Sequence, residues 1–178
     1  MKHILSMLSI TLMVAACVLP VRAKGSPDKI IITGGKPAGS VEITDRNTLK
    51  RFDPWSGQFI TWTKGAVPPP ADQSRSFEVF FYMKWNGRHS NYDRGPLKLI
   101  YSLRYVPGSD GALGYIYLPG KGERFYNNNI GTILRENDDG KWHQASMEWD
   151  LVMKRLIAAQ LNRQVNGWRQ QELSFVGE

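Results

Sequence analysis

The alternation of side chains between Phe77 and Trp85 constrains the fold more than any other feature of this chain. Successive side chains of a β-strand point to opposite faces of its sheet. In the segment FEVFFYMKW, one face would therefore carry Phe77, Val79, Phe81, Met83 and Trp85. The other face would carry Glu78, Phe80, Tyr82 and Lys84. The pattern predicts a strand with one face in the core.

Two further segments continue this pattern and predict an antiparallel meander. In residues 97–106 the expected core face carries Leu97, Leu99, Tyr101, Leu103 and Tyr105. The opposite face would carry Lys98, Ile100, Ser102, Arg104 and Val106. The segment PGSDG then supplies a turn, and residues 114–118 return as the partner strand. Because the second face also contains apolar side chains, we expect partial cover there, and a sandwich-like arrangement stays open.

Helical periodicity is strongest near the C-terminus. Met147–Arg163 is predicted as a long amphipathic helix with Ser146 as its cap. Its apolar stripe consists of Trp149, Val152, Met153, Leu156 and Ile157. Asn166-Gly167 is a stop signal, and Glu172–Val176 is expected to add an edge strand. The same stripe could cover the second face of the meander.

The N-terminal half predicts smaller elements. Residues 30–33 and 41–44 are typical of a β-hairpin, and Asp45 can cap a short helix over Arg46–Phe52. Trp55–Thr63 is interpreted as strand-like, and the prolines at 68–70 as a connector within one domain. The predicted class is α+β: an antiparallel β-meander or sheet with one long amphipathic C-terminal helix and a short N-terminal helix. One domain would span residues 24–178.

Residues 1–23 have the order of a secretory signal. A basic start with Lys2 precedes the apolar run Ile4–Leu19, and the stretch ends in Pro20-Val21-Arg22-Ala23. We therefore expect export, with cleavage after Ala23, to a secreted, periplasmic or cell-surface location. The absence of any other cysteine than Cys17 rules out a disulfide within the chain and favours a bacterial envelope.

Two alternatives for this segment stay open. Val14-Ala15-Ala16-Cys17 resembles the lipobox of bacterial lipoproteins, in which the cysteine is lipidated and becomes the first mature residue. An uncleaved segment would instead anchor the protein, although a spanning helix needs about 20 apolar residues. Contact with a membrane is thus expected only through lipidated Cys17 or an uncleaved signal.

The composition of the chain indicates which classes of binding partner to expect. The chain carries a formal net charge of +7, which raises its affinity for anionic partners such as acidic polysaccharides or cell-wall polymers. The alternative stays open that this charge, which forms no run of five or more like residues, only aids solubility. Export and the lack of a recognised module argue against nucleic acid. Sequence motifs for nucleotide loops, serine elbows and zinc sites are missing, so we expect no cofactor and no metal. These absences favour a non-catalytic function.

The segment 86–96, NGRHSNYDRGP, is the first candidate ligand site. It is longer than a hairpin connection needs, and long loops on rigid strands often carry function. Its candidate ligand-binding residues are Arg88, His89, Tyr92, Asp93 and Arg94. Guanidinium groups recognise carboxylates and phosphates, and a tyrosine ring can pack on a sugar face.

A second candidate loop and a weak catalytic set complete the hypotheses. Arg124 and Tyr126 lie in the loop 121–131, whose three asparagines are expected to stabilise turns. The weak catalytic candidates are two histidines and three carboxylates: His89, His143, Asp93, Glu148 and Asp150. We interpret the chain as an exported module that binds an anionic or glycan-like ligand. The alternatives are a hydrolase of a cell-wall polymer and a structural partner in a surface assembly.

Overall fold

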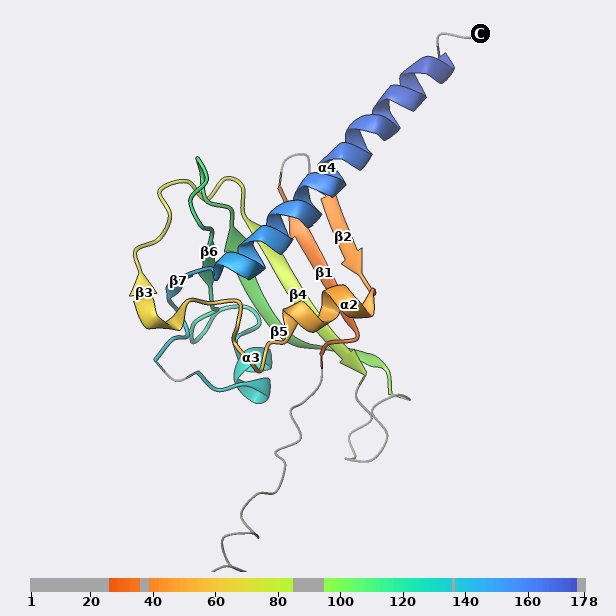
Figure 1. Ribbon diagram of the computed structural model, residues 1–178. Helices are drawn as coiled ribbons and strands as arrows, with labels where there is room; N and C mark the ends of the chain where they lie inside the picture. The colour runs from red at the N-terminus through yellow and green to blue at the C-terminus, as the bar shows by residue number, and fades with distance from the viewer. Residues whose placement is uncertain (1–25, 36–38, 85–94, 136, 176–178) are drawn as a thin grey trace, which may run out of the picture.

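One antiparallel sheet organises the computed structural model, which describes residues 26–35, 39–84, 95–135 and 137–175, with side chains up to residue 162. Within these ranges the sheet has seven strands in the order β2-β1-β4-β5-β6-β7-β3 (Figure 1). Their bounds are β1 Lys29–Gly34, β2 Gly39–Ile43, β3 Ala66–Val67, β4 Phe77–Lys84, β5 Leu97–Val106, β6 Tyr115–Tyr117 and β7 Trp142–Gln144. The predicted α+β class with an antiparallel sheet is confirmed.

Strand β4 has the alternation that the sequence predicts. Its odd-numbered side chains from Phe77 to Met83 are buried, and the even-numbered ones are half-buried. β1 pairs with one edge of β4, with Ile32 opposite Val79, and β5 pairs with the other edge. The meander β4-β5-β6 is likewise confirmed.

A β-bulge corrects the predicted faces of β5. Phe81 lies opposite Tyr101, but the next residue, Tyr82, lies opposite Leu99, so Ile100 is the extra residue. An inserted residue reverses the alternation on one side of the bulge. Leu97 and Leu99 consequently share a face with Lys84 and Tyr82, and Leu97 is 43% exposed. The sequence prediction that they join Leu103 in the core is wrong.

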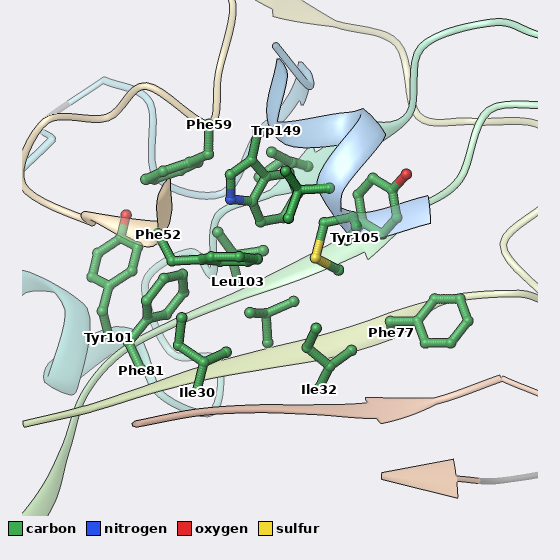
Figure 2. Packing of buried hydrophobic residues seen from close by; sticks show 14 of the residues in the cluster. Ile30, Ile32, Phe52, Phe59, Phe77, Phe81, Tyr101, Leu103, Tyr105 and Trp149 are labelled. Atoms are coloured by element: carbon green, nitrogen blue, oxygen red, sulfur yellow. The ribbon is translucent and has the colours of Figure 1, made fainter. Parts of the chain in front are cut away.

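The helix α4, Met147–Phe175, lies on the core face of the sheet and not on the second face (Figure 1). Trp149, Met153 and Ile157 belong to the same buried cluster as Ile30 and Phe81. Figure 2 shows Trp149 close to Phe52, Phe59 and Tyr105, with which its ring makes edge or tilted contacts. The described part of the chain is thus a two-layer arrangement, not a sandwich, and α4 leaves the second face open.

Helix α4 also extends beyond its predicted end. It continues through Asn166-Gly167 to Phe175, so the predicted stop and the edge strand over Glu172–Val176 are wrong. A glycine within a helix costs only about 1 kcal/mol relative to alanine. The residues that follow it, Trp168 to Leu173, include several good helix formers. In Figure 1 this last part of α4 projects beyond the sheet.

The N-terminal hairpin β1-β2 and the short helix after it are confirmed. The helix α2 spans Arg46–Leu49 and continues as the 3₁₀ helix η1, Lys50–Phe52. Asp45 caps it, since its carboxylate accepts a hydrogen bond of 2.8 Å from the backbone N–H of Thr48. Leu49 and Phe52 bury this short element against the core.

Trp55–Thr63 does not form the predicted strand. It consists of turns, a single β-bridge between Ile60 and Ala145, and the start of the 3₁₀ helix η2, Trp62–Lys64. Gly57 has a positive φ, and a side chain there would meet the indole of Trp62 at 2.9 Å. The large side chains of residues 55–63 reach the core from a bent backbone. This explains why the segment is apolar although it does not form a strand.

The remaining helix, α3, spans Tyr126–Thr132 and packs beside β5. None of the described helices combines the length and the apolar character needed to cross a bilayer.

Candidate functional site

A cavity of about 470 Å³ is lined by residues from the start of β1, the ends of β2 and β4, and α2. These parts of the elements lie at the same end of the sheet (Figure 1). The lining of the cavity is mainly polar and carries more cationic than anionic side chains. The residues are Ser26, Pro27, Asp28, Lys29, Glu42, Thr44, Arg46, Leu49, Lys50, Lys84 and Leu97. We call this cavity the basic groove.

Two hydrogen bonds hold one wall of the basic groove in place. The N–H of Asp28 donates to the carbonyl of Tyr82 at 2.9 Å. In return, the N–H of Lys84 donates to the Asp28 carboxylate at 2.7 Å. These bonds join the segment before β1 to the end of β4, so the backbone that carries Lys29 and Lys84 is held in place.

The charges of the groove are unevenly balanced. Lys29 pairs with Glu42 at 3.0 Å, while Arg46, Lys50 and Lys84 make no ion pair with a described residue. The second acidic side chain, Asp28, accepts the hydrogen bond from Lys84 N. A cavity with surplus cations attracts anions and raises their local concentration. The groove is therefore suited to a ligand with carboxylate, sulfate or phosphate groups.

The open face of the sheet carries half-buried aromatic side chains. We call this set the aromatic band: Phe80, Tyr82, Tyr117, Phe125 and Trp142. Tyr117 and Trp142 lie 5.1 Å apart by ring centroids, and Phe80 and Phe125 lie 5.2 Å apart. Arg104 lies over Tyr117, and Lys29 of the groove lies 5.9 Å from the Tyr82 ring, which connects the band with the groove.

One phenol of the band has a perturbed acidity. Burial, together with the hydrogen bond from Tyr117 Oη to the Glu123 carboxylate, raises the pKa of Tyr117 to about 12. The same carboxylate accepts from the N–H of Gly120 at 2.7 Å and so closes the turn after β6. Tyr117 is therefore held as a neutral hydrogen-bond donor on the open face.

Arg124 and Tyr126, the predicted ligand residues of the second loop, lie at the start of α3. Arg124 is exposed, and its guanidinium lies 4.4 Å from the centroid of the Phe125 ring. Tyr126 is half-buried as the first residue of α3. The structure thus places Arg124 next to the aromatic band and outside the basic groove.

Two asparagines of this loop, Asn128 and Asn129, form hydrogen bonds with the backbone of β5. Asn129 is fully buried, and its amide accepts from the Ser102 N–H at 2.8 Å and donates to the Ser102 carbonyl at 2.7 Å. Asn128 and Thr132 donate to the carbonyls of Leu99 and Ile100. These side chains of α3 form hydrogen bonds with the backbone of β5. From the sequence, the asparagines are instead expected to stabilise turns in their own loop.

The weak catalytic candidates lie in different surroundings. His143 is fully buried in β7, where its ring contacts Trp62 and its Nε2 lies 3.1 Å from the Asp138 carbonyl. Asp150 is 1% exposed and bonds Tyr105, Gly114 and Lys154. Glu148 is exposed and pairs with Arg51 at 3.6 Å. None of the described contacts of these three residues joins the histidine to either carboxylate.

Residues 86–94 of the first candidate loop lie outside the described residues, as does the lipidation candidate Cys17. This applies to Arg88, His89, Tyr92, Asp93 and Arg94, whose ligand role stays a prediction. The described residues Lys84 and Leu97, from the strands that this segment connects, both line the basic groove.

Sequence reasoning missed the groove itself. Its cations come from β1, α2, η1 and β4, and their separation along the chain gives no local motif. Within the described ranges, no cluster of three or more His, Cys, Asp or Glu side chains could hold a metal ion.

Comparisons with protein-family models, curated proteins and solved structures found no match to this chain. The arrangement of the groove, the aromatic band and their charges is therefore the basis for inferring a function.

Proposed function

We propose that this protein is an exported, non-catalytic binding module for an anionic glycan, which binds in the basic groove. The observation that carries the proposal is the excess of cationic side chains around one cavity of about 470 Å³. Arg46, Lys50 and Lys84 lack an acidic partner among the described residues, so their charges are available to a ligand. A neutral ligand would leave these charges without a function.

The aromatic band supports a carbohydrate as the carrier of the anionic groups. Sugar rings present apolar faces that pack on aromatic side chains, while a tyrosine also offers a polar tip. Tyr82 adjoins Lys29 of the groove, so a ligand in the groove can also reach the band. An acidic polysaccharide would satisfy both features, as its carboxylates meet the cations and its rings meet the aromatics.

Export gives this ligand a location. The predicted signal at residues 1–23 would deliver the domain to the envelope or the exterior, where acidic polysaccharides and cell-wall polymers occur. The moderate positive charge of the chain would also favour encounter with such polymers.

Binding to oligogalacturonate, a carboxylated oligosaccharide, tests the proposal. We expect the Lys24–Glu178 protein to bind it with an affinity that falls as salt is added, because ions screen exposed charges. The Arg46→Ala/Lys84→Ala variant removes two groove cations. Each of these cations contributes up to about 1 kcal/mol to the binding free energy. The affinity of the double variant should therefore fall roughly tenfold.

Arg75→Ala/Lys121→Ala is the matched control. It removes the same two residue types from exposed positions outside the groove and should bind like the unmodified protein. Isothermal titration calorimetry at two salt concentrations measures both effects. Equal losses in the two variants, or no binding by the unmodified protein, would contradict the proposal.

A further inference from the structure

A cavity of about 270 Å³ is lined by residues of β4, β5 and α3 and by Trp55. We call it the α3 cavity. None of its lining residues also lines the basic groove or belongs to the aromatic band. The binding proposed above therefore makes no use of this cavity.

The α3 cavity adjoins the basic groove along the ladder of β4 and β5. Lys84 and Leu97, which are paired across the two strands, line the groove. The next pair, Met83 and Lys98, lines the α3 cavity. Successive residues of a strand are only about 3.4 Å apart. The linings of the two cavities therefore meet at the same end of the ladder.

Part of the lining of the α3 cavity is apolar. Trp55 is half-buried, since it packs against the core cluster and also lines the cavity. Its backbone N–H donates to the Asp53 carboxylate at 3.0 Å, which holds the turn that carries the indole. Leu99 and Ile100 add aliphatic surface. Such a lining suits the apolar face of a sugar ring.

Another part of the lining offers polar groups that are accessible to a ligand. Asn127 and Asn128 are exposed and line the cavity from α3. The Asn128 amide donates to the Leu99 carbonyl at 3.3 Å, which orients this side chain. An amide both donates and accepts, as a sugar hydroxyl does, so the two groups are complementary. Lys98 is also exposed and makes no ion pair with a described residue, so it adds a positive charge.

The size of the α3 cavity limits what it can hold. Cavities for drug-sized ligands measure roughly 300–1,000 Å³. A volume of about 270 Å³ therefore suits a single sugar residue. Gly131 contributes to this space, because a Cβ added there would meet no neighbouring atom within 4 Å.

We propose that the α3 cavity binds one uronic acid residue of the anionic glycan whose adjoining residues occupy the basic groove. The sugar ring packs on Trp55, its hydroxyls bond the amides of Asn127 and Asn128, and its carboxylate pairs with Lys98. This inference rests on the proposed function, since it assigns a further subsite to the same polysaccharide chain.

Two-dimensional ¹⁵N NMR of the Lys24–Glu178 protein with a six-residue oligogalacturonate separates the two proposals. We expect saturable shifts of the side-chain amide signals of Asn127 and Asn128, of the Trp55 indole N–H and of the groove amide of Lys84. A shift of Lys84 alone would overturn the α3 subsite and leave the proposed function intact. Shifts of the other three signals without Lys84 would instead contradict binding in the groove. Absence of all four would contradict both.

Gly131→Phe tests the subsite by filling the cavity. The position lies in α3 without a positive φ and has open space beside it, so the larger side chain introduces no backbone strain. Isothermal titration calorimetry should show several-fold weaker binding of the same oligogalacturonate. Gln73→Phe is the matched control: it adds the same side chain at an exposed position outside both cavities and should bind like the unmodified protein.

Asn127→Ala provides a second test that adds no bulk. It removes one polar contact of the sugar from an exposed position of α3, so the affinity should fall while the fold is kept. Unchanged affinity in both Gly131→Phe and Asn127→Ala would overturn the inference. A loss in Gln73→Phe equal to that in Gly131→Phe would overturn it as well.

Discussion

Asp150 shows how one carboxylate joins three parts of the chain. It accepts from the Tyr105 hydroxyl at 2.6 Å and from the Gly114 N–H at 2.9 Å, and it pairs with Lys154 at 2.8 Å. A side chain at Gly114 would lie 2.6 Å from this carboxylate, so the close approach needs glycine. Burial and the Asp150 carboxylate also raise the pKa of Tyr105. Asp150 thus attaches α4 to β5 and to the segment before β6.

Asp150→Ala should lower the free energy of unfolding by about 3 kcal/mol, since it leaves a buried hydroxyl and a buried N–H without an acceptor. Glu148→Ala, which removes an exposed carboxylate from the same helical turn, should cost less than about 1 kcal/mol. Urea unfolding followed by tryptophan fluorescence measures both. Similar losses in the two variants would contradict the structural role of Asp150.

Tyr117 gives the protein an alkaline pH dependence. Because burial and Glu123 raise its pKa above the usual 10.0 to about 12, the folded state favours the neutral phenol. Its contribution to stability is fully present below the unfolded pKa and is lost as pH rises through the folded pKa. Ultraviolet titration, as the difference between the unmodified protein and Tyr117→Phe, should show a phenol that ionises near that higher value.

Glu123→Gln is the control for this titration. Replacing the carboxylate by an amide removes the negative charge beside Tyr117, so the pKa of the phenol should move down toward its usual value. An unchanged titration in Glu123→Gln would mean that Glu123 does not contribute to the shift.

At the scale of elements, side chains of α3 form hydrogen bonds with a part of the β5 edge that no described strand pairs with. β6 pairs with β5 only from Arg104 to Val106, which leaves the preceding part of that β5 edge without a strand partner in the described chain. Asn128, Asn129 and Thr132 of α3 bond the backbone of Leu99, Ile100 and Ser102 there. At Ser102, a helix side chain thus satisfies two backbone groups that would otherwise be unpaired in a buried position.

Asn129→Ala should therefore lower the free energy of unfolding by about 2–4 kcal/mol, because both backbone groups of Ser102 lose their partner. Asn127→Ala is the matched control: its side chain is exposed on the same helix, and no loss above about 0.5 kcal/mol is expected. Amide hydrogen exchange at Ser102 provides a local readout. Protection that survives in Asn129→Ala would refute this role.

The elements differ in how far the sequence predicts them. β4 could be predicted from the sequence because its buried and half-buried side chains alternate over all eight residues, Phe77–Lys84. The bulge at Ile100 escapes prediction because a single inserted residue leaves the composition of β5 unchanged. The true end of α4 could not be predicted, because the unfavourable helix propensity of Gly167 is outweighed by the favourable propensities of many of its neighbours. The basic groove escapes because tertiary contacts alone bring Lys29, Arg46 and Lys84 together.

At the scale of the whole molecule, the two faces of the sheet differ in their side chains and in their roles. One face holds the buried cluster under α2, η1 and α4, and the open face carries the aromatic band. The basic groove lies at the end of the sheet, between these two faces. Stability and proposed binding therefore depend on different surfaces, so groove variants can lose binding without unfolding.

The mature chain should start at Lys24. β1 begins at Lys29, so removal of residues 1–23 leaves all strands of the described sheet intact. Expression of the full sequence in a bacterium, followed by intact-mass spectrometry of the exported protein, should give the mass of Lys24–Glu178. A lipid-bearing product that begins at Cys17 would instead support the lipoprotein alternative.

The position of α4 in the chain also sets the timing of folding. Trp149, Met153 and Ile157 complete the cluster that Ile30 and Phe52 begin, so the core face stays uncovered until the ribosome has synthesised most of the chain. β3 must likewise wait for β7, since Ala66 pairs with His143. Such non-local closure slows folding and leaves apolar surface exposed in the nascent chain. The proposed export requires a chain that is still unfolded at the translocation channel, and this late closure of the core is compatible with that requirement.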